Sequence, residues 1–341
     1  MVSDTQNIQQ SPADSALQDQ FGRKIINLRI SVTDRCNFRC TYCMPAEGMQ
    51  WIARREILTF EEIERLVRIF ASLGVDRVRL TGGEPMMRQN LDQLIAMLKQ
   101  VPGIDNIALT TNGYFLEEGA KALIDAGLDR INISLDSLER EKFSRLVRKD
   151  MLDKVLRGIH TVAKLPIQSI KINMVVIRGV NDNEIPAFAQ LAREHPFKVR
   201  FIEFMPLGAD DDWGRDKVVP SSEVCQQIET VAPLVPIDET DLHPAARYRF
   251  ADGQGEIGVI SSVTAPFCDQ CNRVRITPEG QFRTCLFSLQ ETDLKTLVRG
   301  DASDEDIATT IRQAVWQKEE GHLINRPDFQ RPSRPMSQIG G

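Results

Sequence analysis

Residues 36–43 read Cys36-Asn37-Phe38-Arg39-Cys40-Thr41-Tyr42-Cys43, a Cys-x3-Cys-x2-Cys spacing just after an apolar stretch that ends at Thr33. Thiolates gathered in a short loop are the usual ligands of iron–sulfur clusters, and a four-iron cluster ordinarily takes four of them. The next cysteine along the chain is Cys225, so only three ligands are local. The spacing therefore predicts a four-iron cluster with one iron left open to a small molecule.

A structural zinc site is the alternative interpretation of this loop. Zinc sites of that kind have four protein ligands, usually in Cys-x2-Cys pairs or with a histidine nearby. The first histidine of the chain is His160, far from the loop. The ligand count therefore favours the cluster.

The composition limits the classes of protein that fit. The 341 residues suffice for one large α/β domain with an appendage, and a net charge of −6 argues against nucleic acid or a membrane surface as a partner. No apolar run approaches the length that spans a bilayer. Residues 1–20 are polar and lack the features of a secretory signal, which predicts a disordered leader. Seven cysteines in such a chain indicate reduced thiols and a cytoplasmic location.

Short β-rich runs alternate with helical patterns, and this alternation predicts parallel βαβ units. The expected strands are residues 25–32, 77–81, 107–111, 130–135, 170–177 and 199–204. The first helix is expected after Thr59, which forms a capping box with Glu62. Further helices are expected at residues 91–98, 116–124, 152–162, 185–192 and 224–231. We therefore predict an α/β fold, a partial (β/α)6 TIM barrel, two units short of a closed eight-fold barrel.

Polar or glycine-rich residues follow the predicted strands, where barrels of this type place their active sites. After the cysteine loop of the first strand, these residues are Gly82-Gly83-Glu84, Asn112, Ser134 and Met205. The paired glycines remove side chains where the backbone approaches another group, although such a stretch can also be only a strand-to-helix turn. The pattern predicts a functional site at one rim of the barrel.

A second cysteine set lies near the C-terminus. Cys268 and Cys271 form a Cys-x2-Cys pair, and thirteen residues separate Cys271 from Cys285. Three thiols again predict a cluster with an open iron, while a zinc knuckle completed by Cys225 or His243 is the alternative. Two such clusters would each leave one iron open to a ligand.

These motifs resemble the GTP 3′,8-cyclases of molybdenum cofactor biosynthesis, a family of the radical S-adenosylmethionine superfamily. The resemblance rests on the first cysteine loop with Tyr42, on residues 28–36, 79–85, 200–205 and 268–275, and on the terminal Gly340-Gly341. It implies that two 4Fe-4S clusters are present, held by Cys36, Cys40 and Cys43 and by Cys268, Cys271 and Cys285. The first cluster would cleave S-adenosylmethionine to a 5′-deoxyadenosyl radical, which removes hydrogen from C3′ of GTP before the sugar carbon attacks C8.

The resemblance also implies which residues bind the cofactor and the substrate. S-Adenosylmethionine is expected to contact Tyr42, Gly83, Glu84, Asn112, Ser134 and Met205. GTP is expected to contact Arg29, Arg79, Thr110, Lys171, Arg273, Val274 and Arg275, with guanine at the second cluster. Arginine suits phosphate because its planar fork makes two directed hydrogen bonds, and alternation along a strand aims Arg273 and Arg275 the same way.

The implied partners are GTP, an electron donor of the flavodoxin or ferredoxin type and a downstream cyclic pyranopterin monophosphate synthase; a homodimer is compatible with the family. We expect a leader at residues 1–20, a barrel with the first cluster at 21–241 and a C-terminal domain with the second at 242–324. This domain would contain strands at 248–262 and helices near Leu294 and at 304–318. The tail, residues 325–341, is predicted to be disordered by default, although the resemblance places its double glycine in the site.

Two other functions remain open at this point. The chain could be another radical enzyme with an auxiliary cluster that modifies peptides or tetrapyrroles, or a non-catalytic iron or zinc sensor. No Gly-x4-Gly-Lys-Ser/Thr loop occurs, so ordinary GTP hydrolysis is not expected.

Overall fold

The computed structural model describes residues 16–208, 213–237 and 245–340. Within them the strands form one 12-stranded sheet in the order β12-β11-β10-β1-β2-β3-β4-β5-β6-β9-β8-β7. The six predicted strands are β1 (Asn27–Ser31), β2 (Arg77–Thr81), β3 (Asn106–Thr111), β4 (Arg130–Ser134), β5 (Ser169–Val176) and β6 (Phe197–Glu203). Neighbours pair in parallel in chain order, which confirms the predicted partial barrel.

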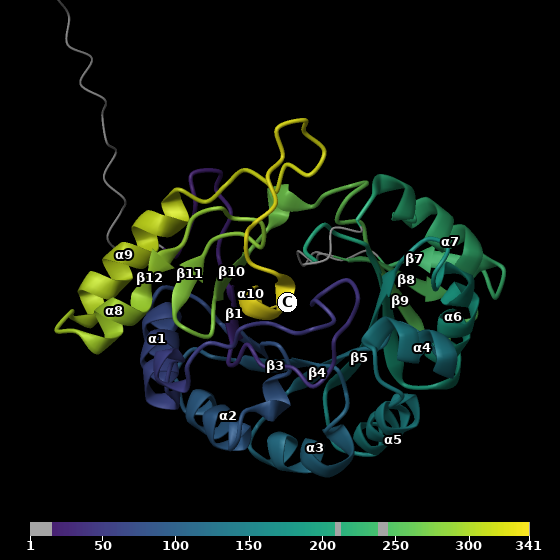
Figure 1. The fold of residues 1–341 in the computed structure, drawn as a ribbon, viewed down its shortest axis with the longest axis horizontal. Coiled ribbons are helices and arrows are strands. Elements are labelled where there is room, and N and C mark those ends of the chain that lie inside the picture. The colour runs from purple at the N-terminus through teal and green to yellow at the C-terminus, as the bar shows by residue number, and fades with distance from the viewer. Residues whose placement is uncertain (1–15, 209–212, 238–244, 341) are drawn as a thin grey trace, which may run out of the picture.

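Helices cover the outer face of this curved sheet, as Figure 1 shows. They are α1 (Phe60–Ser72), α2 (Leu91–Lys99), α3 (Leu116–Asp125), α4 (Arg140–Val147), α5 (Leu152–Val162), α6 (Ile185–Glu194) and α7 (Ser221–Glu229). The predicted capping box begins α1, since the Glu62 amide donates to Thr59 and the Thr59 amide to Glu62. The short helix α4 was not predicted, because only three of its eight residues are buried apolar ones.

The core lies between the sheet and the helices. Alternate strand residues such as Leu28 and Ile30 of β1 and Leu80 of β2 are fully buried against helical residues such as Phe70. Successive strand residues point to opposite faces of a sheet. The residues between the apolar ones, including many arginines, therefore face the inside of the barrel.

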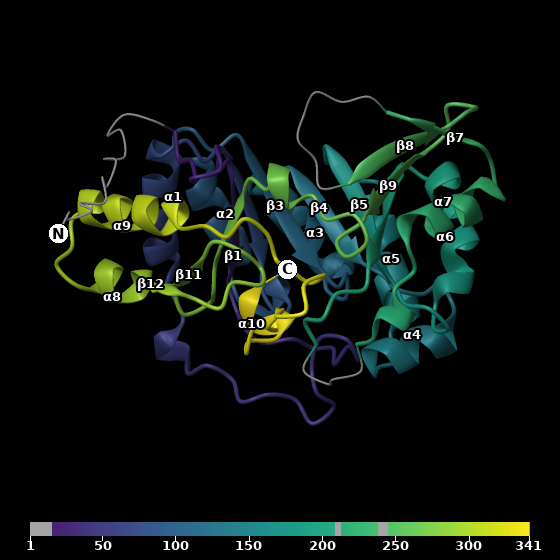
Figure 2. The same cartoon turned by 90° about the horizontal axis from the view of Figure 1, so that it is seen from above.

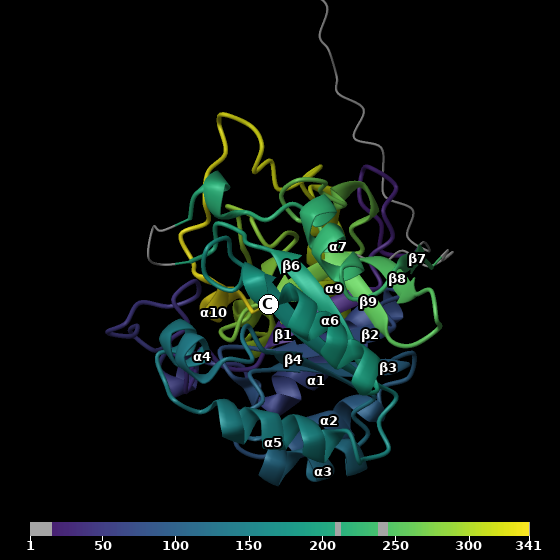
Figure 3. The same cartoon turned by 90° about the vertical axis from the view of Figure 1, so that its right-hand side faces the viewer.

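The C-terminal region extends the same sheet at both edges and does not form a sheet of its own. Strand β9 (Glu256–Ile260) pairs in parallel with β6, and β10 (Arg273–Ile276) pairs in parallel with β1. Antiparallel strands β7 (Leu234–Pro236), β8 (Ala246–Phe250), β11 (Gln281–Arg283) and β12 (Thr292–Asp293) flank them. Helices α6 and α7 pack outside β6 and β9 (Figure 3). The predicted domain boundary at residue 241 lies outside the described residues.

The predicted disordered leader is wrong for its last residues. Leu17 and Asp19 are buried, the Leu17 amide donates to the Leu73 carbonyl at 2.9 Å, and the Asp19 carboxylate pairs with Arg23 at 2.6 Å. Residues 1–15, the rest of that prediction, lie outside the described part of the chain. The barrel therefore includes residues 16–20.

The default prediction of a disordered tail is also wrong for residues 325–340. After α8 (Leu294–Arg299) and α9 (Asp304–Trp316), the chain turns back and ends in α10 (Met336–Ile339) at the centre of the ring of helices (Figure 1). Figure 2 shows α10 on the same side as the loop between β1 and α1. Arg275 donates to the Gly340 carbonyl at 2.7 Å. The expected entry of the tail into the barrel is thus confirmed up to Gly340, while Gly341 is not among the described residues.

Candidate active site

The first cysteine set lies in the loop that follows β1, at the carboxyl ends of the parallel strands. The loop rests on α4, because the Arg39 amide donates to Val147 at 3.1 Å and the Thr41 amide to Leu146 at 2.9 Å. The thiols of Cys36, Cys40 and Cys43 are all free and partly buried. Packing against α4 therefore fixes a compact loop that presents three sulfur atoms.

The turn after β2 packs directly on this loop. A Cβ atom on Gly83 would lie 2.6 Å from the Asp34 carbonyl oxygen, so only glycine fits there. The Gly83 amide donates to Thr33 and the Glu84 amide to Arg35, both at 2.7 Å. The paired glycines thus serve the close approach that the sequence predicts.

Glu84 organises the neighbouring strand end. It is fully buried, and its carboxylate accepts hydrogen bonds from Met86 N at 3.0 Å, Thr111 Oγ1 at 2.7 Å and Asn112 N at 2.7 Å. Burial raises the pKa of Glu84 to about 7. Asn112 in turn places its side-chain nitrogen 3.9 Å from the Cys36 sulfur. Contact of Glu84 with a cofactor stays a prediction, since both carboxylate oxygens already accept bonds.

Tyr42, between two cysteines of the loop, is held by a buried carboxylate. Its hydroxyl donates to Asp136 at 2.5 Å, and the other Asp136 oxygen accepts from the Val175 amide at 2.8 Å. Burial raises the pKa of Asp136 to about 6 and that of Tyr42 well above its usual value. Strand β4 ends at Ser134, two residues before Asp136, and Ser134 pairs with Asn173 of β5. Asp136 thereby links the cysteine loop to the ends of β4 and β5.

The surroundings of the first thiols disfavour their charged forms when no metal is bound. Burial raises the pKa of Cys36 to about 11 and of Cys43 to about 12.

In the described part of the chain, no three His, Cys, Asp or Glu side chains converge to hold one metal ion. A zinc ion needs its ligands within about 2.3 Å of one centre. Of the alternative zinc ligands, Cys225 is hydrogen-bonded to Tyr248, and His243 lies outside the described residues.

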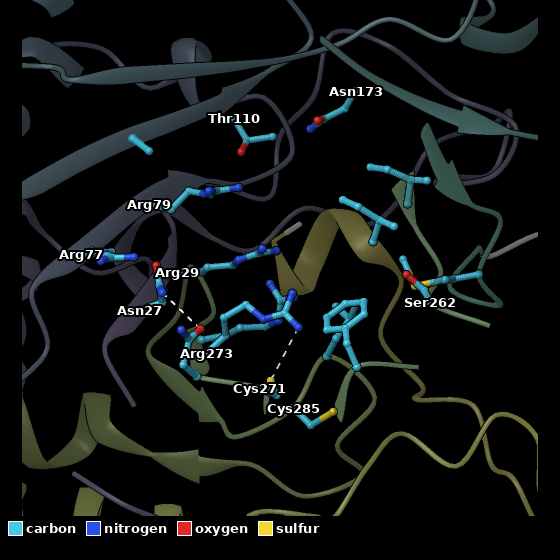
Figure 4. A pocket seen from close by; sticks show the side chains of 18 of the residues that line it. Asn27, Arg29, Arg77, Arg79, Thr110, Asn173, Ser262, Cys271, Arg273 and Cys285 are labelled. Carbon is cyan, nitrogen blue, oxygen red and sulfur yellow. Dashed lines mark hydrogen bonds between the residues drawn. The ribbon is translucent and has the colours of Figure 1, made fainter. Parts of the chain in front are cut away.

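A cavity of about 240 Å³ occupies the inside of the barrel. No carboxylate is among the described residues that line it, whereas eight cationic side chains are: Arg29, Arg77, Arg79, Arg130, Lys171, Arg200, Arg273 and Arg275. Strand register places Arg275, Arg29 and Arg79 side by side on β10, β1 and β2. Figure 4 shows Arg29, Arg79 and Arg273 reaching toward one space, with Cys271 and Cys285 beside it.

The described residues neutralise only part of the positive charge of this cavity: Arg77 pairs with Asp76 at 3.5 Å, and Glu256 acts on Arg200. Burial, together with the neighbouring cations, lowers the pKa of Arg79 and Arg275 to about 9 and that of Lys171 to about 6. Two buried polar atoms on the wall, Thr110 Oγ1 and Asn173 Oδ1, have no hydrogen-bond partner among the described residues. Buried polar groups normally have partners. The cavity is therefore suited to a polar polyanion.

The second cysteine set, Cys268, Cys271 and Cys285, lines this cavity. Arg273 lies over the set, with its guanidinium nitrogen 3.6 Å from the Cys271 sulfur. Burial raises the pKa of the Cys271 thiol, but the charges of Arg273 and Lys318 outweigh this effect and bring it down to about 6. Arg273 pairs with Asn27 at the start of β1, while the first set follows the end of that strand. The two sets thus lie beyond opposite ends of β1, whose five residues span about 13 Å.

The C-terminal helix α10 lies between the two cysteine sets. The Ser337 backbone is hydrogen-bonded to Cys43 of the first set. Gly340, three residues later, accepts the bond from Arg275 beside the second set. Met336 lines the cavity. The tail therefore connects both ends of the site.

Most predicted substrate residues meet in this cavity. Those that line it are Arg29, Arg79, Thr110, Lys171, Arg273 and Arg275, together with Met205. The side chain of Val274 is fully buried in the hydrophobic core between the two arginines, and the expected contact of this residue with GTP stays a prediction. Tyr42, Gly83, Glu84, Asn112 and Ser134 lie near the first cysteine set or at neighbouring strand ends, and their contact with a cofactor stays a prediction.

Four further wall residues were not predicted: Arg77, Arg130, Arg200 and Asn173. The signal was present in the sequence. Arg77 and Asn173 lie two positions from the predicted Arg79 and Lys171 on the same strands, so they share a face with them. Including the residues two positions away from each predicted residue on the same strand would have identified both Arg77 and Asn173.

Comparison with known proteins agrees with this arrangement. Residues 30–192 match the Radical SAM superfamily, and residues 197–324 match the Molybdenum Cofactor Synthesis C family. The GTP 3′,8-cyclase of Streptomyces coelicolor is 44% identical over 95% of this chain and 96% of the relative. That of Syntrophomonas wolfei is 45% identical over 95% of this chain and 99% of the relative.

Solved structures show the same fold at low sequence identity. Streptococcus suis SuiB bound to the precursor peptide SuiA is similar with a TM-score of 0.60 and 14% identity, over 91% of this chain and 75% of that one. SuiB bound to S-adenosylmethionine gives a TM-score of 0.59 and 15% identity, over 91% and 76%. No helix among the described residues is long and apolar enough to cross a membrane. On the near-full-length identity to curated relatives, the chain belongs to the GTP 3′,8-cyclase family of the radical S-adenosylmethionine superfamily.

Proposed function

We propose that this protein converts GTP into 3′,8-cyclo-7,8-dihydro-GTP, the first step of molybdenum cofactor biosynthesis. One observation carries the proposal. A cavity walled by eight cationic side chains, with no carboxylate among its described lining residues, has one set of three free thiols on its wall and is joined through α10 to the other. A triphosphate needs such charge, and a two-cluster radical reaction needs such thiols.

The donor sets fit two four-iron clusters. Each set offers three thiols, and three ligands for four irons leave one iron open. Thiolates in a cluster bind different irons, so they need not converge on one point. Cys36, Cys40 and Cys43 would hold the first cluster, which when reduced would supply the electron that cleaves S-adenosylmethionine. The radical chemistry made available at this site is removal of hydrogen from C3′ of GTP, and closure onto C8 would be completed by one further electron from the donor and a proton.

The side chains of the cavity bind and orient the substrate. Arginine and lysine on β1, β2, β5, β6 and β10 hold the triphosphate, and guanine lies toward Cys268, Cys271 and Cys285. Thr110 and Asn173 have unpartnered polar atoms that can accept or donate to the nucleotide. Ring closure between C3′ and C8 depends on orientation, because a held geometry replaces a bimolecular encounter. The tail helix α10 shields the site from water.

The strand ends near the first cysteine set bind S-adenosylmethionine. Tyr42, Gly83, Glu84, Asn112, Ser134 and Met205 are the proposed contacts. Glu84 and Asp136 act mainly through others, since they fix Asn112 and Tyr42 by short hydrogen bonds. This arrangement would keep the cofactor between the first set and the substrate cavity.

The proposal includes partners outside the chain. An electron donor of the flavodoxin or ferredoxin type reduces the first cluster, and a cyclic pyranopterin monophosphate synthase consumes the product. A cytoplasmic location is supported by the seven cysteines, which are all free thiols. A homodimer is compatible with these features.

Product analysis after anaerobic reaction tests the proposal. Reconstituted protein is incubated with dithionite, S-adenosylmethionine and GTP, and the products are identified by mass. Cyclised GTP and 5′-deoxyadenosine should form together. ATP in place of GTP should give no cyclised product, and cyclised ATP at a similar rate would contradict the proposal.

Cysteine variants separate the two sets. Cys36→Ala should abolish 5′-deoxyadenosine, and Cys268→Ala should abolish cyclised GTP while the first cluster is still reduced. Cys225→Ala, which removes the half-buried thiol on α7, is the matched control and should keep both products. Normal cyclisation by Cys268→Ala would exclude a substrate-holding role for the second set.

A further inference from the structure

Lys318, just after α9, is a buried cation that the proposed chemistry leaves unused. Its side chain is only 1% exposed. Its ammonium donates to the Arg273 carbonyl at 3.2 Å and to the Thr284 carbonyl. None of the ion pairs seen among the described residues includes it. A buried ammonium without a carboxylate is costly unless another negative group lies close by.

The two carbonyls belong to chain segments that carry the second cysteine set. Arg273 lies two residues beyond Cys271, and Thr284 immediately precedes Cys285. The charge of Lys318 acts on both of these cysteines. One ammonium thus fixes two of the three ligand segments, and its charge is close enough to act on the thiols of both.

Arg23 ties down the third segment. It is 7% exposed and donates to the Cys268 carbonyl at 2.7 Å and to the Glu320 carbonyl at 2.8 Å. Its charge is balanced by Asp19 at 2.6 Å. Glu320 is close to Lys318 in sequence, so one short stretch after α9 anchors all three ligand segments. Of the two cations, Lys318 is the one without a carboxylate partner in the described structure.

Charged groups of both signs act on the two cysteine sets. Glu84 and Arg39 act on Cys36 of the first set, and Lys318 and Glu319 act on Cys285 of the second. At Cys271 the cations Arg273 and Lys318 outweigh the effect of burial, so positive charge prevails there. Net charge around a cluster is one of the factors that set its reduction potential.

We propose that Lys318 is a positioning residue that supplies fixed positive charge to the second cluster, raising its reduction potential and helping to retain its iron. Three thiolates outweigh the positive charge of an oxidised four-iron core, so the bound cluster is an anion. When this anionic cluster is bound, its negative charge and the positive charge of the buried Lys318 stabilise each other. The inference rests on the two-cluster cofactor set of the family and concerns a residue that does not touch the substrate.

A redox titration of the reconstituted full-length protein tests this inference. Dithionite reduces the clusters, and electron paramagnetic resonance follows each reduction step. The step missing from Cys268→Ala is assigned to the second cluster. Lys318→Gln keeps a donor to the carbonyls but removes the charge, so that step should move to a more negative potential. Lys318→Arg keeps the charge and should keep the wild-type potential.

Lys295→Gln is the matched control. Lys295 is partly buried on α8 and pairs with Glu56 at 2.7 Å, so its loss should move neither step. Lys318→Gln protein with full iron content and both steps unmoved would overturn the inference. Loss of the second cluster from both Lys318→Gln and Lys318→Arg would also overturn the inference, since the charge would then not be what retains the cluster. Loss of the second cluster from Lys318→Gln alone would support the inference. Wild-type protein with about four irons per chain would instead overturn the two-cluster set.

Discussion

Lys171 predicts that binding of GTP takes up a proton. Burial and the charges of Arg200, Arg79 and Arg130 lower the pKa of this lysine from 10.5 to about 6. At neutral pH most of the nucleotide-free protein therefore carries an uncharged Lys171. Phosphate oxygens next to the amine favour its charged form, so the bound complex regains the proton.

The sign and size of the effect follow from these two states. Below pH 6 Lys171 is charged with or without GTP, and its contribution to affinity is constant. Above pH 6 one proton must be taken up on binding, so this group weakens affinity by up to tenfold, about 1.4 kcal/mol, for each pH unit. Between pH 7 and pH 8, Lys171 should thus raise the Kd for GTP by about tenfold.

Isothermal titration calorimetry measures both quantities. GTP is titrated into reconstituted protein without reductant or S-adenosylmethionine, in two buffers that differ in ionisation enthalpy, and the difference gives the number of protons taken up. Lys171→Arg is the matched control, because arginine stays charged over this range while ionisation of GTP itself is unchanged. Equal proton uptake and equal pH dependence in the two proteins would refute the reasoning.

Three further predictions follow from packing and hydrogen bonds. Gly340→Ala should undock α10 and speed amide exchange of residues 338–340. Gly340 has φ +86°, and a Cβ atom there would lie 2.9 Å from the Ser31 Cβ. The control is Gly179→Ala, because Gly179 also has a positive φ, +72°, but an added Cβ would meet open space. Unchanged exchange in Gly340→Ala would contradict this packing. Glu84→Gln should lower the free energy of unfolding by about 1–3 kcal/mol in denaturant titrations, since an amide nitrogen would face a backbone donor, and a stability equal to wild type would show that these bonds contribute little. Arg200→Met should raise the Kd for GTP by roughly ten- to a hundredfold if a charged phosphate contact of about 1.5–3 kcal/mol is lost, with no comparable change in the affinity for guanosine.

Local sequence patterns predicted the individual strands and helices well. They did not predict which strands lie next to one another at the edges of the sheet. Strand β2 and the start of α1 agree with the prediction, because alternating apolar residues and a Thr59–Glu62 capping box act over a few residues. Strands β9 and β10 were not assigned to the barrel sheet. Their partners lie far away in sequence, and pairing between such segments depends on the whole fold.

The candidate site was predictable where chemistry is concentrated in few residues. The thiols of the second set and the alternation of Arg273 and Arg275 identified one part of the cavity wall. The tail was expected in the site only through the resemblance. Lys318 was not predicted as a site residue, since a lysine near the end of a helix is ordinarily solvated. Lys318 becomes buried only in the folded protein, where the end of α9 lies against β10 and Lys318 donates to the Arg273 carbonyl.

The sheet order also bears on how the chain matures on the ribosome. Until residues 256–276 have been synthesised, β1 and β6 have no outer neighbours and present exposed backbone groups. Such unpaired edges invite association between nascent chains, so the last quarter of the polypeptide protects the first three quarters against aggregation. The thiols of the second set are likewise brought together only after Cys285 has been synthesised and β10 has joined β1.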